Sequence, residues 1–331
     1  MKTFDFHRAV SIEDAVRLVA QSGGRYLAGG TNLVDLMKNG VEEPPALVDI
    51  GGLDLAGIEA TPTGGVLMGA RATNTAVANH DLVRGQYPVL SQAILSGATA
   101  QLRNMATAGG NLLQRTRCPY FMDVAFGACN KRQPDSGCAA LTGFHRTHAV
   151  FGASEHCVAV HPSDMAVALT ILDAVVHVSG CDGDRQIPVD EFFRPPGDTP
   201  HIDNTLQPGE LIIGIELPPS RLAANSWYLK VRDRQSYAFA LVSVAAGLDI
   251  RDGVVTDAAI ALGGVAAKPW RLPAAEQVLL GQPPGPAAFD AAARLALEGA
   301  QPLPQNTFKV DLGKHSVMRA LTLAAALQSH E

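Results

Sequence analysis

The chain has 331 residues and a formal net charge of −6. Its contents of hydrophobic (47%) and charged (18%) residues are typical of a globular protein and exclude disorder, and its acidic balance argues against a nucleic-acid surface. No apolar run reaches the ~18 residues of a membrane span, and Asp5, Glu13, Asp14 and Arg17 stand where a signal peptide would be apolar, so we expect no membrane insertion and no export by this N-terminus.

Residues 1–57 are predicted to form a small α/β unit. Ser11 is a typical N-cap for an amphipathic helix that ends at Gly23 and Gly24. A strand at 25–28, a glycine turn, a helix at 32–39 and a strand at 47–50 follow. This order places Gly29 and Gly30 just before a helix N-terminus.

Residues 58–219 are predicted to form a larger unit. Its expected elements are a strand at 66–70, helices at 73–79 and 87–96, a second glycine turn at 108–111, a helix at 165–172 capped by Ser163, and a strand at 174–178. The segment at about 114–160 is rich in turn residues and has no sustained periodicity. The pair Pro218-Pro219 is the predicted boundary, because paired prolines end a strand.

Residues 220–331 are predicted to form a C-terminal domain. Antiparallel strands are expected at 227–231, 238–250 and 254–262, and Asp252-Gly253 is typical of the hairpin turn that joins the last two. Apolar helices at 287–298 and 317–328 complete it. The predicted fold class is therefore α+β.

Two glycine turns carry the first functional signal. A glycine N–H can approach a bulky anion closely, and a helix start adds unpaired N–H groups, so such turns are suited to phosphate. Neither turn matches a Rossmann or P-loop pattern. Two of them indicate two halves of one nucleotide site, while the alternative for the first is a tight βα turn with Thr31 as N-cap. The candidate residues are Leu27, Ala28, Gly29, Gly30, Thr31, Asn32 and Leu33, then Ala106, Thr107, Gly110 and Asn111.

Four clustered cysteines carry the second signal: Cys118, Cys129, Cys138 and Cys157. They contain no Cys-x-x-Cys pair, which weakens a zinc-ribbon interpretation. Four thiolates also suit a four-iron cluster, and two disulfides or free thiols are further alternatives. The nearby His145, His148, His156 and His161 are predicted to be loop residues or backbone hydrogen-bonders, and Cys181 to be incidental at a hairpin tip.

In both glycine turns and over almost its whole length, the chain resembles the FAD-binding subunit of the xanthine dehydrogenase family of molybdenum hydroxylases. The two glycine turns resemble that family's pyrophosphate loops, and residues 161–165 resemble its segment whose aspartate contacts the flavin. Residues 209–213 and 227–230 resemble the strand and the lysine that approach the isoalloxazine. The resemblance implies further FAD contacts by Gln114, Asp164, Ile212 and Lys230.

The chain departs from most relatives by a long stretch between Asn111 and Asp164 that holds the four cysteines. This pattern resembles the bacterial, periplasmic-type aldehyde oxidoreductase branch, whose FAD subunit carries an extra 4Fe-4S cluster, and implies metal ligation by all four. A second departure is Gly97, where mammalian relatives have an aromatic residue over the flavin.

The resemblance implies a two-subdomain FAD-binding (PCMH-type) domain and a smaller domain with a three-stranded antiparallel sheet and helices. It implies electron transfer through FAD in a molybdenum-dependent aldehyde oxidoreductase, with no catalytic residue for substrate in this chain. The molybdenum cofactor would sit on a large partner subunit and 2Fe-2S clusters on a small one. The complex would be periplasmic, exported by a partner's signal, or cytoplasmic. Alternatives are the same role for xanthine, CO or an N-heterocycle, a stand-alone NAD(P)H-linked flavin reductase, and a zinc- or disulfide-stapled scaffold.

Overall fold

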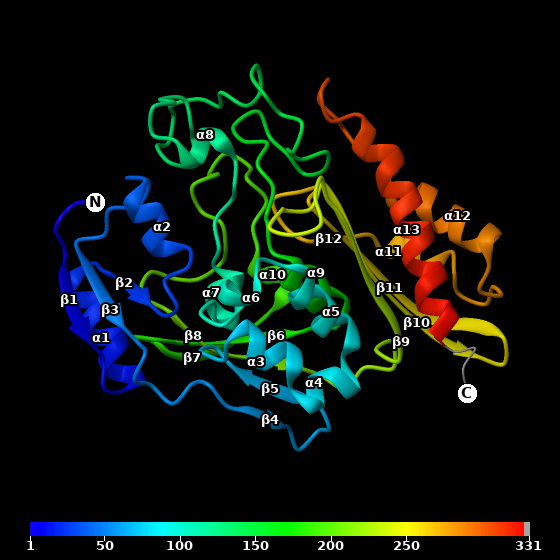
Figure 1. Ribbon diagram of the computed structural model, residues 1–331, viewed down its shortest axis with the longest axis horizontal. Helices are drawn as coiled ribbons and strands as arrows, with labels where there is room; N and C mark the ends of the chain where they lie inside the picture. The colour runs from blue at the N-terminus through cyan, green and yellow to red at the C-terminus, as the bar shows by residue number, and fades with distance from the viewer. Residues whose placement is uncertain (328–331) are drawn as a thin grey trace.

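The computed structural model describes residues 1–327, and the first sheet of the fold is a small parallel one (Figure 1). Its strands are β1 (Asp5–Arg8), β3 (Ala46–Asp49) and β2 (Arg25–Leu27), paired in that order, with helices α1 (Ile12–Ser22) and α2 (Leu33–Lys38). The Ser11 hydroxyl accepts a hydrogen bond from the Asp14 N–H at 3.1 Å, and Gly23 ends α1 at a φ of 64°. The elements predicted for this segment are therefore confirmed.

The second sheet is antiparallel, and the segment between its strands β5 and β8 contains the second glycine turn, the four clustered cysteines and Asp164. The strand order is β4 (Ile58–Ala60), β5 (Val66–Gly69), β8 (Leu211–Leu217), β6 (Val175–Gly180) and β7 (Gly183–Pro188). The accompanying helices are α3 (Asn74–Asn79), α4 (Asp81–Gln86), α5 (Pro88–Ser96), α6 (Ala100–Arg103), α7 (Ala108–Leu112), α9 (Asp164–Ile171) and α10 (Val189–Phe192). Cys181 is exposed at the tip of the β6–β7 hairpin, as expected.

The third sheet is antiparallel and has four strands. Three long strands were predicted, and they are β9 (Asn225–Val231), β10 (Val242–Arg251) and β11 (Val254–Gly263). The fourth, β12 (Trp270–Arg271), is too short for its residues to show an alternating pattern. The predicted hairpin turn is confirmed, because Asp252 and Gly253 have φ angles of 50° and 76°.

Three helices pack on the third sheet: α11 (Pro273–Gln277), α12 (Pro286–Ala296) and α13 (Phe308–Ala326). Helix α13 begins nine residues before its predicted start, because buried Lys309 and Gly313 in its first turns interrupt the apolar pattern. The predicted last residue of this helix, Gln328, lies outside the described residues.

The third sheet lies between two cores. Along β10, Val244 and Ala246 pack into the core that contains α12 and α13, whereas Ala245 faces the core of the second unit. The residues of β10 and β11 on that second face are small, namely Ala245, Ala259 and Ala261. Helices α5 and α9 of the second unit therefore pack directly against the third sheet. This packing places residues of the second unit next to residues of the C-terminal domain.

The cysteine-bearing stretch at about 114–160 projects above the second sheet as loops and turns around one short helix, α8 (Pro119–Met122; Figure 1). Its far end is tied to the C-terminal part of the chain. Val150 and Phe151 donate backbone hydrogen bonds to the Val265 carbonyl, and the Phe151 ring stacks on Trp270 with centroids 5.2 Å apart.

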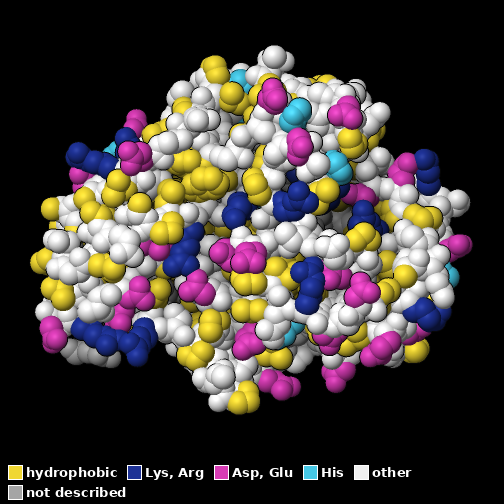
Figure 2. Space-filling view, turned by 180° about the vertical axis from the view of Figure 1, so that it is seen from behind, with side chains coloured by type: hydrophobic (Ala, Val, Ile, Leu, Met, Phe, Trp, Pro, Cys, Tyr) yellow, Lys and Arg dark blue, Asp and Glu magenta, His cyan; other side chains and the backbone are white. Residues whose placement is uncertain are grey.

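Among residues 1–327, no helix combines the length and the apolar character that crossing a membrane requires. Figure 2 shows acidic and basic side chains interspersed over the face of the molecule seen from behind, without an extended basic patch on that face.

Candidate functional site

The two glycine turns lie against each other. A Cβ built on Gly29 would collide with the backbone carbonyl of Met105, directly before the second turn. Gly30 has a φ of 70°, which an L side chain adopts only with strain. The structure therefore brings together the two segments that the sequence pairs, and glycine at position 29 is what allows the contact.

The first turn offers free donors. The backbone N–H groups of Gly29, Gly30 and Thr31 make no hydrogen bond to any residue in the described part of the chain. The Asn32 side chain accepts a hydrogen bond from the Arg115 N–H at 3.0 Å, while its own Nδ2 is buried without a partner. Thr31 does not cap α2, so the N-cap alternative is wrong. Unpaired N–H groups ahead of a helix are what a pyrophosphate needs.

The second turn differs from the prediction. Residues 108–112 are not a loop but the short helix α7, whose N-cap Thr107 accepts a hydrogen bond from the Gly110 N–H at 3.3 Å. The N–H groups of Ala108 and Gly109 donate to the carbonyls of Ala72 and Ala70. Because its glycine N–H groups are used within the protein, this turn cannot supply anion donors as the first one does.

Side chains after the second turn form a small polar cluster. The Asn111 Oδ1 accepts hydrogen bonds from Gln114 Nε2 at 2.8 Å and from the Ser163 hydroxyl at 2.6 Å. Ser163 in turn caps α9 through the Ala166 N–H. Asn111 and Gln114 are thus joined to the segment that carries Asp164.

A buried ion pair joins α9 to β9. Asp164 Oδ2 lies 2.7 Å from Lys230 Nζ, and its Oδ1 accepts a hydrogen bond from the Tyr228 hydroxyl at 2.7 Å. Lys230 also donates to the Ser96 carbonyl at 3.2 Å. Burial raises the pKa of Tyr228 well above its ordinary value, and the nearby Asp164 carboxylate adds to the shift. The position of Lys230 next to the basic Arg232 would also fit a solvated surface lysine, but the structure buries its side chain in this pair.

Ile212 lies away from these groups. Its side chain is buried in the core of the second sheet, because residues of β8 alternate between the two faces. The following residue, Ile213, packs instead against the core of the first sheet, as does Ala28 of the first turn. A resemblance at the level of a segment cannot distinguish neighbouring strand residues that face opposite sides.

The four clustered cysteines line one small cavity together with Lys131 and His156. All five cysteines of the chain are free thiols, so the disulfide alternative is not realised. In residues 1–327, no three His, Cys, Asp or Glu side chains are arranged to hold a single metal ion. The four thiols therefore share one cavity without forming a site for a single metal ion among the described residues.

His148 contacts one of the four clustered cysteines, Cys118. Its Nε2 lies 3.1 Å from Cys118 Sγ, and the side chain is buried. Burial lowers the pKa of His148 to about 4 and raises the pKa of Cys118 to about 12. His145 bonds to the backbone, at the Ala140 carbonyl, as predicted. His148 is a loop residue, also as predicted, but its ring contacts a cysteine and not the backbone.

An ion network connects the cysteine stretch to the first glycine turn. Lys131, next to the cysteine cavity, is paired with Asp203, and Arg115 Nε lies 2.8 Å from the same carboxylate. Arg115 also pairs with Glu42 at 2.5 Å and donates its N–H to Asn32. Burial opposes ionisation of Asp203, but the two cations hold its pKa below the ordinary value. Sequence reasoning missed this network because its members are far apart in the chain.

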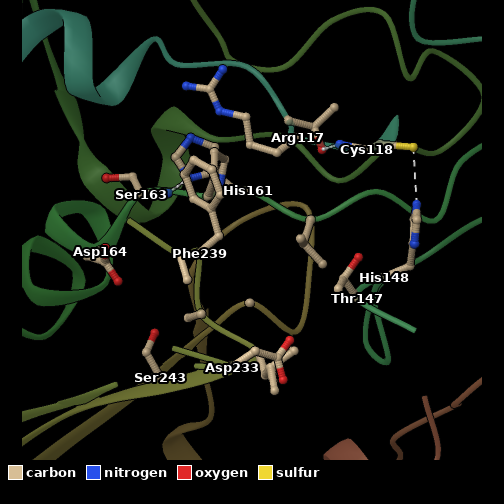
Figure 3. A pocket seen from close by; sticks show the side chains of 17 residues that line it. Arg117, Cys118, Thr147, His148, His161, Ser163, Asp164, Asp233, Phe239 and Ser243 are labelled. Atoms are coloured by element: carbon tan, nitrogen blue, oxygen red, sulfur yellow. Dashed lines mark hydrogen bonds between the residues drawn. The ribbon is translucent and has the colours of Figure 1, made fainter. Parts of the chain in front are cut away.

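A cavity of about 230 Å³ is lined by Asp164 of the ion pair and, among the cysteines, by Cys118. Figure 3 shows Asp164 on one side of it and Cys118 on the other, with His148 joined to Cys118 by a hydrogen bond. Phe239 covers Arg117, with the guanidinium 5.2 Å from the ring centre. Asp164 and Cys118 thus line opposite sides of the same cavity.

Residues 2–220 match the model of the FAD-binding domain in molybdopterin dehydrogenase, and residues 227–324 match that of the CO dehydrogenase flavoprotein C-terminal domain. Fold and site thus define a flavoprotein of two parts. The chain belongs to the FAD-binding subunits of the molybdenum hydroxylase family, which are oxidoreductase components.

Individual relatives agree with this assignment. The chain is 50% identical over 328 residues to the aldehyde oxidoreductase FAD-binding subunit PaoB of Escherichia coli, across 98% of this chain and 99% of that protein. It is 28% identical to the carbon monoxide dehydrogenase medium chain of Afipia carboxidovorans, across 89% and 85%. A crystal structure of the Cu,Mo-CO dehydrogenase matches with a TM-score of 0.76 at 25% identity, across 98% and 99%.

Proposed function

We propose that this chain is the FAD-binding electron-transfer subunit of a molybdenum-dependent aldehyde oxidoreductase and that it also holds a 4Fe-4S cluster. The observation that carries the proposal is the 50% identity, over nearly the full length of both chains, to an aldehyde oxidoreductase FAD-binding subunit. The oxidation of an aldehyde to a carboxylic acid releases two electrons, and this subunit would pass them to an acceptor.

Bound FAD would supply two-electron redox chemistry that no amino-acid side chain offers. The free N–H groups of Gly29, Gly30 and Thr31 would bind its pyrophosphate, and the buried, unpaired Asn32 Nδ2 is a further donor there. Asp164 and Lys230 would orient the flavin edge as a neutral pair, so the lysine would not present a free positive charge. Of the contacts predicted from the sequence, we keep those of the first turn and those of Asn111, Gln114, Asp164 and Lys230. We drop Ile212, which is buried in the core, and pyrophosphate binding by the second turn, whose glycine N–H groups bond within the protein.

The proposal of an iron cluster is supported by the four cysteine thiols that line one cavity. Burial raises the pKa of Cys118 and of Cys157, so these thiols stay protonated until a bound cation stabilises the thiolate. The ligands would be Cys118, Cys129, Cys138 and Cys157. Cys118 lies across one cavity from Asp164, which supports a cluster that would exchange electrons with the flavin and would also hold the loop together.

Substrate oxidation would belong to partner subunits. We propose a large subunit with the molybdenum cofactor and a small subunit with 2Fe-2S clusters, and we assign no general acid or base to this chain. The similarity to a carbon monoxide dehydrogenase medium chain supports one alternative, the same electron-transfer role for a substrate other than an aldehyde. Turnover of the complex with aldehydes, xanthine and CO in parallel distinguishes the two.

The test is the content of FAD, iron, zinc and acid-labile sulfide in the freshly purified complex. We expect one FAD, about four iron and about four sulfide per chain. FAD without iron after anaerobic preparation would overturn the cluster and keep the flavoprotein. The absence of FAD would overturn the proposal as a whole.

A further inference from the structure

We propose that His148 donates a hydrogen bond from Nε2 to the Cys118 thiolate and thereby raises the reduction potential of the 4Fe-4S cluster. This inference rests on the cluster in the proposed function. His148 touches a ligand and not the metal, so it acts as a positioning and tuning residue.

The contact itself is specific. Figure 3 shows the imidazole directed at the Cys118 sulfur, and the Nε2 to Sγ distance is 3.1 Å. The other ring nitrogen, Nδ1, is buried without a hydrogen-bond partner. A thiolate that ligates iron has no proton to give, so the hydrogen of this bond must come from the ring. Nδ1 is then the unprotonated nitrogen, and an unpaired acceptor is the less costly group to bury.

The backbone of His148 is fixed by the C-terminal helix. Its carbonyl accepts hydrogen bonds from Asn306 Nδ2 at 3.1 Å and from Lys309 Nζ at 2.9 Å. Lys309 is fully buried and also binds the carbonyls of Thr147, at 2.9 Å, and Gly264, at 2.7 Å. Two side chains of the C-terminal domain thus hold the imidazole at the sulfur, which gives a loop residue the rigidity that a fixed hydrogen bond needs.

A hydrogen bond to a ligating sulfur withdraws negative charge from the cluster and favours the reduced state. In residues 1–327 the other groups that hydrogen-bond to the cysteine sulfurs are backbone N–H groups, such as that of Ala159 at 3.5 Å from Cys157 Sγ, and cannot be removed by a side-chain substitution. His148 is therefore the donor whose effect on the cluster can be isolated by mutation.

The experiment compares His148→Leu, His148→Gln and a control, His156→Leu, in the complete complex. His156 lines the same cysteine cavity, but no hydrogen bond joins its ring to a cysteine in the described structure. Iron and sulfide are counted first, and the midpoint potential of the cluster is then measured by redox titration followed by EPR. For His148→Leu we expect full iron and a lower potential. A tenfold fall in the equilibrium constant for one-electron reduction corresponds to about 59 mV.

His148→Leu and His148→Gln separate the effect of the hydrogen bond from the effect of a changed side-chain shape. His148→Gln retains an N–H donor and is expected to keep its potential near that of the unmodified protein, as is His156→Leu. An unchanged potential in His148→Leu with full iron overturns the inference. If His148→Leu loses iron, retention in His148→Gln supports the inference and equal loss in both overturns it. The absence of iron from the unmodified complex would instead refute the proposed cluster.

Discussion

Lys230 Nζ lies 2.7 Å from Asp164 Oδ2, and the two side chains are only 4% and 9% exposed. The lysine comes from β9 of the C-terminal sheet and the aspartate from the first turn of α9. The pair therefore links the two parts of the protein at the place where we put the flavin edge.

Removal of one member of this pair should destabilise the protein more than removal of both. In Lys230→Met the Asp164 carboxylate stays buried with only the Tyr228 hydroxyl, and breaking a buried pair in this way typically costs about 3–5 kcal/mol. The double variant Lys230→Met, Asp164→Asn should recover most of the loss. Urea denaturation measures both, and a double variant less stable than the single one would contradict this interpretation.

Gly29→Ala should weaken FAD binding. The added methyl group would meet the Met105 carbonyl and push the two turns apart. Overpacking of this kind costs about 1–3 kcal/mol, so we expect the Kd for FAD to rise about tenfold or more. Fluorescence titration of the FAD-depleted complex measures the Kd.

The matched control is Gly85→Ala. A Cβ at Gly85 meets no atom within 4 Å, and the residue lies in α4, where alanine is the better helix former. Its FAD affinity should equal that of the unmodified protein. An equal loss in both variants would mean that the contact between Gly29 and Met105 is not what matters.

Cys118→Ser should remove most of the iron and leave FAD in place, because the cysteine cavity and the glycine turns are built from different segments. Cys181→Ser, at the exposed hairpin tip, should change neither. Metal analysis and flavin absorbance give both numbers. Full iron in Cys118→Ser would refute its role as a ligand.

Acid should destabilise the protein through His161. Burial lowers the pKa of this imidazole from 6.5 to about 4, and the ring packs at a tilt against Phe193 with centroids 4.5 Å apart. Between pH 4 and 6.5 the unfolded state therefore binds more protons, so the free energy of unfolding falls as the pH falls. At about 1.4 kcal/mol per pKa unit, the expected loss over this window is about 3 kcal/mol.

His161→Phe should abolish this contribution while it preserves the ring contact. Denaturant unfolding at pH 4 and at pH 6.5 compares the two proteins. Between pH 6.5 and pH 4 the free energy of unfolding should fall by about 3 kcal/mol more in the unmodified protein than in the variant. An unchanged pH dependence in the variant would show that His161 is not the group that titrates.

The elements with strong local signals could be predicted from the sequence. Ser11 and Gly23 delimit α1, and Asp252-Gly253 forms the hairpin turn between β10 and β11. The three long C-terminal strands lie within a few residues of their expected positions. The misses have physical causes. The two residues of β12 are too few for a pattern, and buried Lys309 and Gly313 conceal the start of α13.

The composition of the site was readable in the sequence, but its connections were not. Residue type and family resemblance were enough to identify the glycine turns, the clustered cysteines, Asp164 and Lys230 as candidate site residues. The use of the second turn's N–H groups within the protein, the burial of Ile212 and the contact between His148 and Cys118 depend on segments that meet only in the folded chain.

The sequence by itself determined the family, the helices and strands with local start and stop signals, and the residue types available for flavin and iron. Only the tertiary structure decided which of those residues meet, because hydrogen bonding, burial and charge pairing between distant segments arise from packing. Lys230 illustrates the division: its sequence neighbours include Arg232 and Arg234 and favour a solvated surface residue, whereas the packing of α9 on the C-terminal sheet buries it against Asp164.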